Sequence, residues 1–519
     1  MNQNKASGSQ RRENFYKNVM STAVYRLITP ICAFLTRTAF IYLLGMKYVG
    51  ISGLFTDILN VLSLSELGIS SAITYALYRP LAEDDQEKIT QLMLFFKTAY
   101  RVIGIAIMGI GCVIMPFVPQ LISKDAVVPV NIFLVYFVYL LNTAISYFFF
   151  SYRTVLLTAA QKNYREQIVN TVTSIIYTAI LIGILFLSHN FMLYLIVQLI
   201  LGIIKNIIVA HIVNQMFPHA FDKTTATLDI KEMRVLWKNV YSVFVGKISG
   251  TIFTSADSMI ISKCISTISV GILSNYRVLI AFATSICGLF TGGMLPAVGE
   301  MAAKESPEEC EKRFSKYNFI QMWVTSVIAI CLMAVLTPFI RLWAGEKNML
   351  SQLTVAALVL NFWMDLILQM VYQFRAAYGL YPYGKYLQLI ASVINIFVSI
   401  WWAGYWGIFG VLFATSVLNS ITFIYPYFLY KYGFECSSRK YYKSLFQHFL
   451  ITVAAQGLVI LLCRYSFKNL VFDLIIRAVV SFLLSNMVLL ICYHKSEGWD
   501  FMKRELYSVI KKLIKNKRQ

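Results

Sequence analysis

The stretch FMLYLIVQLILGIIKNIIVAHIVNQM, residues 191–216, indicates the fold class most clearly, because Lys205 is its only formally charged residue. It is longer than the roughly 20 apolar residues that a helix needs to cross a bilayer. Similar stretches recur from about Tyr16 to Tyr493, separated by short polar breaks. Charged residues make up 14% of the chain, against about 25% in soluble domains. The sequence therefore predicts an all-α polytopic membrane protein and leaves no room for a large soluble domain.

The hydrophobic pattern divides the chain into fourteen predicted membrane spans. They cover residues 15–46, 49–80, 88–117, 128–160, 163–187, 191–216, 233–264, 269–303, 310–343, 349–378, 382–404, 407–431, 440–464 and 469–494. Several are longer than one bilayer crossing requires, so we expect these helices to tilt or to project beyond the hydrocarbon.

The basic residues between the spans predict the orientation. If the N-terminus is cytoplasmic, the loops on its side carry roughly four times as many Lys and Arg residues as the loops on the opposite side. Both termini are therefore predicted to be cytoplasmic, with residues 1–14 forming an N-terminal cytoplasmic segment. Most of the formal net charge of +21 follows from this topology, so it does not indicate nucleic-acid binding.

The C-terminal segment 495–519 is basic and amphipathic. One helical stripe collects its apolar residues, Trp499, Met502, Leu506, Val509 and Leu513. This pattern predicts a helix lying on the inner leaflet, and a disordered basic tail is the alternative.

An internal repeat is visible at a shift of 221 residues, where KYVGI (47–51) aligns with ISVGI (268–272). At this shift, or one residue off it, charged residues also align: Arg26 with Lys247, Arg37 with Asp257, Asp57 with Arg277, and Arg153 with Arg375. Such residues are rare in spans, so their coincidence is less easily accidental. The repeat predicts two parallel six-helix lobes, 15–216 and 233–431, joined by a cytoplasmic linker at 217–232. Spans 13 and 14, residues 440–494, are an addition.

Charged residues inside the spans are the candidate functional residues. Each costs at least about 2.5 to 3.5 kcal/mol at a lipid-facing helix centre, so it must face protein or a water-filled cavity. The basic residues outnumber the acids, and a positive surplus in a cavity favours an anionic ligand. The candidates for substrate binding are Arg26, Arg37, Lys97, Arg101, Lys205, Lys247 and Arg277. The candidates for ion coupling or for structural ion pairs are Asp57, Glu66, Asp257 and Asp365.

Depth in the membrane suggests partners for some of these charges. Arg37 and Asp57 lie at similar depths on their spans, and so do Asp257 and Arg277, which predicts one ion pair in each lobe. The alternative to a substrate site is that these charges only form structural pairs that hold the helices together.

Neither a metal site nor a catalytic centre is expected. The nine cysteines contain no CxxC pair, and the five histidines show no metal-ligand spacing. A nucleotide-binding G-x-x-x-x-G-K-[ST] motif is missing, so the chain itself is not expected to be an ATP-driven pump, and no cofactor is expected.

Three segments resemble a known family. GLFTDILNVLSLSELGISSAITYALYRPLAEDD (53–85), KITQLMLFFKTAYRVIG (88–104) and ADSMIISKCISTISVGILSNYR (256–277) are similar to stretches of Wzx-type bacterial polysaccharide flippases. These flippases belong to the multidrug/oligosaccharidyl-lipid/polysaccharide (MOP) exporter superfamily, with MATE antiporters and the lipid II flippase MurJ. The resemblance implies two lobes in a V shape around a cationic cavity.

The resemblance also implies a function, that of a flippase for undecaprenyl-diphosphate-linked oligosaccharide in the bacterial cytoplasmic membrane. Alternating access would deliver the repeat unit for surface polysaccharide or lipopolysaccharide synthesis. The cavity charge would come from Arg26, Arg37 and Lys247, and Glu66 and Asp257 are candidates for coupling to H+ or Na+. Membrane lipids, a polysaccharide polymerase and assembly proteins are the implied partners.

Two other functions stay open at this stage. A MATE-like exporter of cationic drugs should have an acidic cavity, and the basic surplus argues against it. A membrane polysaccharide polymerase or glycosyltransferase usually has a sizeable external loop, whereas the external connections here are short. We therefore do not expect an enzyme.

Overall fold

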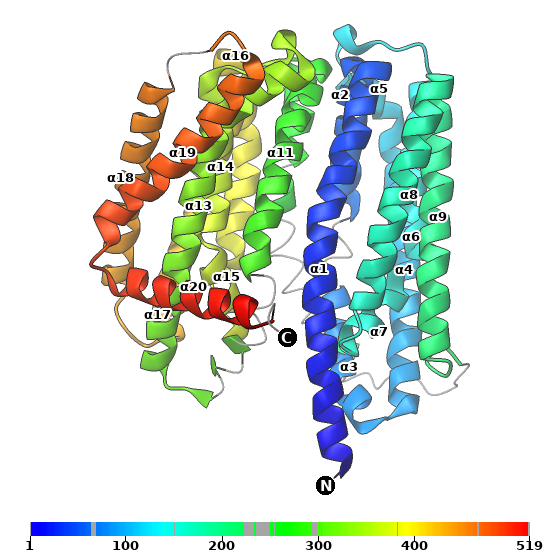
Figure 1. Ribbon diagram of the computed structural model, residues 1–519. Coiled ribbons are helices and arrows are strands. Elements are labelled where there is room, and N and C mark those ends of the chain that lie inside the picture. The colour runs from blue at the N-terminus through cyan, green and yellow to red at the C-terminus, as the bar shows by residue number, and fades with distance from the viewer. Residues whose placement is uncertain are drawn as a thin grey trace. The chain divides into compact units, whose positions relative to one another are not determined.

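The computed structural model describes residues 2–63, 69–149, 151–222, 233–234, 250–253, 255–291, 298–299, 301–302, 304–380, 382–463 and 467–516. The secondary structure of these residues is helical (Figure 1). Ten helices among them are long and apolar enough to cross a membrane. The prediction of an all-α polytopic membrane protein is thus confirmed, and the count of fourteen spans stays a prediction.

The first part of the chain follows the predicted spans closely where polar residues cap the helices. Asp85 accepts a hydrogen bond from the Lys88 amide at 2.9 Å, and Asn190 accepts one from the Leu193 amide at 3.1 Å, so these residues fix the starts of two helices. The helices of this part are α1 (Asn2–Leu43), α2 (Met46–Leu62), α3 (Ile69–Glu83), α4 (Gln86–Ile114), α5 (Val118–Leu121), α6 (Ile132–Phe149), α7 (Thr154–Ala159), α8 (Tyr164–Ser188) and α9 (Phe191–Met216).

The second part of the chain contains a helix that is interrupted at a glycine. Gly407 has φ 57° inside α16, and it breaks that helix at the predicted boundary between spans 382–404 and 407–431. The helices are α11 (Thr267–Thr291), α13 (Pro307–Ala344), α14 (Gln352–Ile367), α15 (Gln369–Ala377), α16 (Lys385–Asn419), α17 (Tyr425–Tyr432), α18 (Arg439–Leu462), α19 (Leu470–Tyr493) and α20 (Glu497–Asn516).

Several predicted spans contain more than one helix. Span 128–160 contains α6, a 3-10 turn at Ser151–Arg153 and α7, and span 349–378 divides at Leu368 into α14 and α15. A hydropathy profile does not reveal such interruptions, because the residues on either side of them are as apolar as the other residues of the span.

The chain forms two compact units. Unit 1 comprises Met1–Val278 and Lys385–Val411, and unit 2 comprises Leu279–Gly384 and Leu412–Gln519. The two six-helix lobes inferred from the repeat stay a prediction.

Within unit 1, α2 and the first part of α11 meet at two glycines that the repeat aligns, Gly50 and Gly271. A Cβ on Gly50 would lie 2.2 Å from the carbonyl oxygen of Thr267, and a Cβ on Gly271 would lie 2.9 Å from the Gly50 amide nitrogen. Only glycine allows two helix backbones to approach this closely.

We predict that Gly50→Ala destabilises the chain by about 1 to 3 kcal/mol, because the added methyl group meets backbone rather than a flexible side chain. Thermal unfolding in detergent measures the effect. Gly109→Ala on α4 is the matched control, since a Cβ there has no neighbour within 4 Å. Equal stability of the two variants would contradict the close contact.

In unit 2, a buried histidine on α18 forms hydrogen bonds with the neighbouring helices α13 and α19. His448 lies with its Nε2 atom 2.9 Å from Ser326 Oγ and 3.1 Å from the Met322 carbonyl oxygen, and its Nδ1 atom is 3.1 Å from Tyr493 Oη. Ser326 also accepts a hydrogen bond from Trp363 Nε1 at 3.0 Å. The histidine is therefore hydrogen-bonded at both ring nitrogens in the core of unit 2.

Candidate functional site: charged residues in the membrane helices

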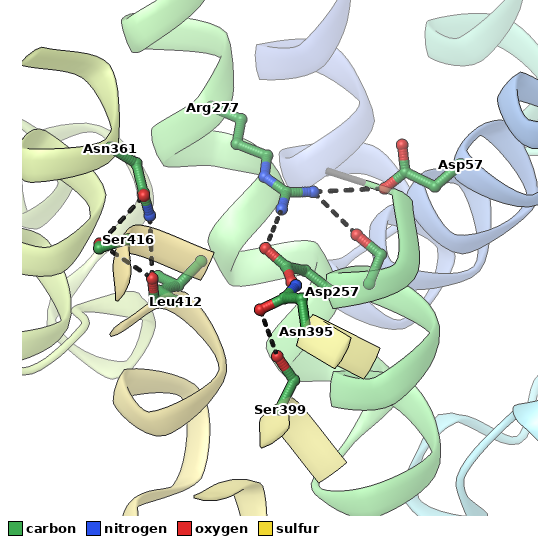
Figure 2. Close-up of polar contacts among 9 residues, drawn as sticks. Asp57, Asp257, Arg277, Asn361, Asn395, Ser399, Leu412 and Ser416 are labelled. Atoms are coloured by element: carbon green, nitrogen blue, oxygen red, sulfur yellow. Dashed lines mark hydrogen bonds and ion pairs between the residues drawn. The ribbon is translucent and has the colours of Figure 1, made fainter. Parts of the chain in front are cut away.

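Arg277 on α11 lies between two carboxylates of unit 1 (Figure 2). Its Nη1 atom is 3.3 Å from Asp57 Oδ2 on α2, and its Nη2 atom is 3.7 Å from Asp257 Oδ2. Nη1 also donates to Ser258 Oγ at 2.8 Å. The Asp257 side chain is 3% exposed, whereas that of Asp57 is 21% exposed, so Asp257 depends more on the guanidinium for its charge balance.

This geometry confirms the predicted pair of Asp257 with Arg277, but the predicted pair of Arg37 with Asp57 is wrong. Depth along a span does not determine which face a residue occupies. The close approach of α2 and α11 at the two glycines brings Asp57 to Arg277 instead.

Arg37 on α1 is held by two neutral residues of α11. Its Nε atom donates to Asn275 Oδ1 at 3.0 Å, and Nη2 donates to Ser274 Oγ in a short contact. Among the residues that the structure describes, no carboxylate pairs with Arg37. The hydrogen bonds therefore orient the guanidinium without neutralising it.

Lys97 and Arg101 on α4 are also without a carboxylate partner in the described part of the chain. They are four residues apart and lie next to each other on the helix surface, with Lys97 partly buried and Arg101 exposed. The turn that packs against α4 carries a third basic residue, Arg153, whose guanidinium lies 5.1 Å from the Phe221 ring centre.

Lys205 on α9 differs from these residues, because Glu166 on α8 is its electrostatic partner. Glu166 was not among the membrane acids identified from the sequence. The residue lies in the first turn of α8, at the edge of span 163–187. Its position on the span that precedes the helix of Lys205 was the signal that could have identified it as a partner.

In unit 2, a separate set of polar residues forms hydrogen bonds between α14 and α16. Asn361 donates to the Leu412 carbonyl oxygen at 3.0 Å and accepts from Ser416 Oγ at 3.0 Å (Figure 2). One helical turn further along α14, Asp365 accepts from Asn419 Nδ2 at 2.8 Å. No cationic side chain of the described residues forms an ion pair with Asp365.

Three candidates remain to be placed. Arg26 lies on α1, where it is partly buried and interacts with at least one other group. Glu66 and Lys247 lie outside the described residues. Of the predicted set, the structure thus brings together Asp57, Asp257 and Arg277, and it places Arg37, Lys97, Arg101, Lys205 and Asp365 in other surroundings.

Asp125 connects two loops through hydrogen bonds next to the α2–α11 contact, and we call this group of polar residues the junction. Its carboxylate accepts hydrogen bonds from Ser123 and Ser266, and Lys263 Nζ donates to the Gln120 carbonyl oxygen at 2.8 Å. Partial burial acts to raise the pKa of Asp125, but the hydrogen bonds from the two serines outweigh it and hold that pKa below its ordinary value.

A lowered carboxyl pKa makes this junction pH-dependent. The ionised form of Asp125 contributes stability above the ordinary carboxyl pKa of about 3.9, and the contribution is lost as the pH falls below that value. We expect Asp125→Asn to unfold at a lower temperature than the parent chain at pH 7, and the difference to shrink as the pH is lowered below about 4. A difference that stays constant over this range would show that the carboxylate charge is not involved.

These features define a polytopic α-helical membrane protein that holds several charged residues inside its membrane helices. Residues 15–302 match the family model described as polysaccharide biosynthesis protein, and the chain belongs to this family. No curated protein matches the sequence.

Solved structures show the same fold at low sequence identity. The lipid II flippase MurJ in an inward closed conformation is 17% identical, with a TM-score of 0.63, and the alignment covers 91% of this chain and 98% of that chain. A point mutant of the MATE transporter VcmN from Vibrio cholerae is 16% identical, with a TM-score of 0.57 and coverage of 83% and 99%. An inward-facing multidrug resistance MATE transporter of the MOP superfamily is 11% identical, with a TM-score of 0.54 and coverage of 76% and 94%. The predicted relation to polysaccharide biosynthesis proteins is thus confirmed, and the fold is similar to that of MurJ and of MATE transporters.

Proposed function

We propose that the chain is a flippase that moves an undecaprenyl-diphosphate-linked oligosaccharide across the bacterial cytoplasmic membrane. Membership of the polysaccharide biosynthesis family and a fold similar to that of a lipid II flippase support this proposal. Both termini would be cytoplasmic, as the distribution of basic residues predicts.

The observation that carries the proposal is the set of membrane-helix cations without a described carboxylate partner, namely Arg37, Lys97 and Arg101. An uncompensated cation inside a bilayer is costly unless it meets water or an anion. A diphosphate supplies two negatively charged groups that a guanidinium can bind through paired hydrogen bonds and an ammonium can bind as a point charge. A cationic drug offers no such compensation.

The neutral partners of Arg37 suit this role. Asn275 and Ser274 hold the guanidinium in one orientation and leave its charge available to a ligand. The repeat-related Arg26 and Lys247 are proposed to contribute further positive charge. Arg277, in contrast, already forms ion pairs with two carboxylates, and Lys205 has Glu166 as its electrostatic partner. We therefore assign Arg277 and Lys205 to structural roles rather than to substrate binding.

Transport would require the sugars and the diphosphate to pass through a hydrated path while the lipid chain remains in the bilayer. Alternating access would move the head group between leaflets. Asp365, whose described partner is the neutral Asn419, is the candidate for coupling to H+ or Na+, and Glu66 is a further candidate from the sequence. A polysaccharide polymerase and assembly proteins are proposed to act on the delivered repeat unit.

Asp365 also favours a second candidate function. A membrane carboxylate without a described cationic partner could bind a cationic substrate, as expected for a MATE-like exporter. This candidate accounts for Asp365 but not for Arg37, Lys97 and Arg101.

Reconstitution into vesicles tests the proposal. We expect the chain to transfer labelled undecaprenyl-diphosphate oligosaccharide to the opposite leaflet, where a membrane-impermeant reagent modifies its sugars. Protein-free vesicles and an excess of a lipophilic cation serve as controls. Transfer that equals the protein-free rate, or export of the cation alone, would reject the flippase assignment.

A further inference from the structure

The C-terminal helix α20 is attached to α13 through its first turns. The indole rings of Trp499 and Trp323 are stacked with their centres 5.3 Å apart and their planes at 19°. A Cβ on Gly498 would lie 2.5 Å from Cγ of Phe319, so the α20 backbone approaches this ring closely. Met502 is 8% exposed and belongs to the same core cluster as Trp323.

The direction of α20 differs from that of the membrane helices of unit 2. Figure 1 shows α20 lying across α13 at one end of this unit. Since α13 is long and apolar enough to span the membrane, α20 is placed to run along the membrane surface. The docked turns therefore fix both the depth and the direction of the rest of this helix.

Beyond Met502, α20 continues for fourteen residues, to Asn516, or about 21 Å. Leu506, Val509 and Leu513 share the helical register of Trp499 and Met502. Lys511, Lys512 and Lys515 fall outside that register, and residues 506–516 contain no Asp or Glu. This segment thus combines an apolar stripe with a positive charge that has no acidic counterpart within it.

We propose that α20 is a binding surface for anionic phospholipid, rigidly connected to α13. An apolar stripe flanked by lysines fits the boundary between acyl chains and negatively charged headgroups. A zwitterionic surface would satisfy the apolar stripe but not the lysines. Because Trp499 stacks on Trp323, lipid bound along α20 stabilises α13 and hence unit 2.

The test uses the full chain in detergent, titrated with phosphatidylglycerol, with phosphatidylcholine or with inorganic phosphate. We expect phosphatidylglycerol to raise the unfolding temperature and the other two additives to leave it nearly unchanged. The triple variant Lys511→Gln/Lys512→Gln/Lys515→Gln should need at least about ten times more phosphatidylglycerol for the same rise. The matched control Lys124→Gln/Lys347→Gln/Lys468→Gln, which removes three exposed lysines on the predicted opposite side, should titrate like the parent chain.

Two further readouts make the outcome decisive. Trp499→Ala should still retain phosphatidylglycerol in native mass spectrometry, but the lipid should no longer raise its unfolding temperature. The proposal is overturned if the α20 triple variant titrates like the parent chain, if phosphatidylcholine is as effective, or if inorganic phosphate reproduces the effect. None of these measurements depends on transport, so failure of this proposal would leave the flippase assignment standing.

Discussion

Arg37→Gln is expected to reduce transfer of the lipid-linked oligosaccharide by at least about tenfold in reconstituted vesicles. Hydrogen bonds to a charged group contribute roughly 1.5 to 3 kcal/mol, and each 1.4 kcal/mol corresponds to about a factor of ten in binding. The guanidinium of Arg37 has only neutral partners among the described residues, so its charge is available to the diphosphate. Arg37→Lys should retain part of the activity, because it keeps the charge and loses the planar fork.

A structural role for Arg37 would give a different result. Asn275→Ala removes a hydrogen bond from the guanidinium but leaves its charge in place. We expect this variant to lose about 1 to 3 kcal/mol of stability and to keep much of its transport activity. If Asn275→Ala and Arg37→Gln lose stability and transport in the same proportion, Arg37 only holds α1 against α11.

Arg277→Ala is expected to lower the free energy of unfolding by about 3 to 5 kcal/mol, because it removes the guanidinium that forms ion pairs with two buried or partly buried carboxylates. Thermal unfolding and the amount of chain in the membrane measure this loss. The effect should be larger than that of Asp57→Asn, which leaves Arg277 with its second carboxylate, Asp257.

The matched control for this prediction removes the charges together. The neutral triple variant Asp57→Asn/Asp257→Asn/Arg277→Gln should recover much of the stability, because both carboxylates and the guanidinium are neutralised together. An Arg277→Ala chain as stable as the parent chain would mean that the ion pairs contribute nothing to unit 1. Exchanging Asp257 and Arg277 is a poorer test, since it would place an aspartate at position 277, next to Asp57.

The sequence predicted the membrane class and many helix boundaries, because both depend on local properties. Hydropathy identifies residues 191–216, and the structure places α9 over the same residues, with Asn190 as its cap. The break near Gly407 was visible because glycine interrupts the apolar run there. The interruption at Leu368 was not, because nothing in its composition distinguishes it from the flanking helix.

The candidate site was only partly predictable for a similar reason. Charged residues in apolar spans are conspicuous, so Arg37, Asp57, Asp257 and Arg277 were all identified from the sequence. Their partners depend on which helix faces cross, and this is determined by the contact between Gly50 and Gly271. Neutral partners such as Asn275 give no signal in a sequence, because an asparagine can serve any polar neighbour.

The fold and the charged residues give different information about the substrate. The fold is shared with a lipid II flippase and with multidrug transporters, so it does not choose between an anionic and a cationic substrate. The cations of unit 1 that lack a carboxylate partner among the described residues favour an anion, whereas Asp365 in unit 2 suits a coupling ion. The geometry of the two units therefore does not require the substrate and the coupling ion to bind at the same site.

Direct binding of the head group tests the central claim that the cations of unit 1 capture a diphosphate. The affinity of the purified chain for undecaprenyl-diphosphate oligosaccharide should be compared with that of the stably folded variant Lys97→Gln/Arg101→Gln/Arg37→Gln. We predict that the parent chain binds the diphosphate lipid and that the triple variant binds it at least about a hundredfold more weakly, since three charged contacts are lost. Equal affinity of the two chains, or binding of an uncharged undecaprenol glycoside as strong as that of the diphosphate, would contradict the account.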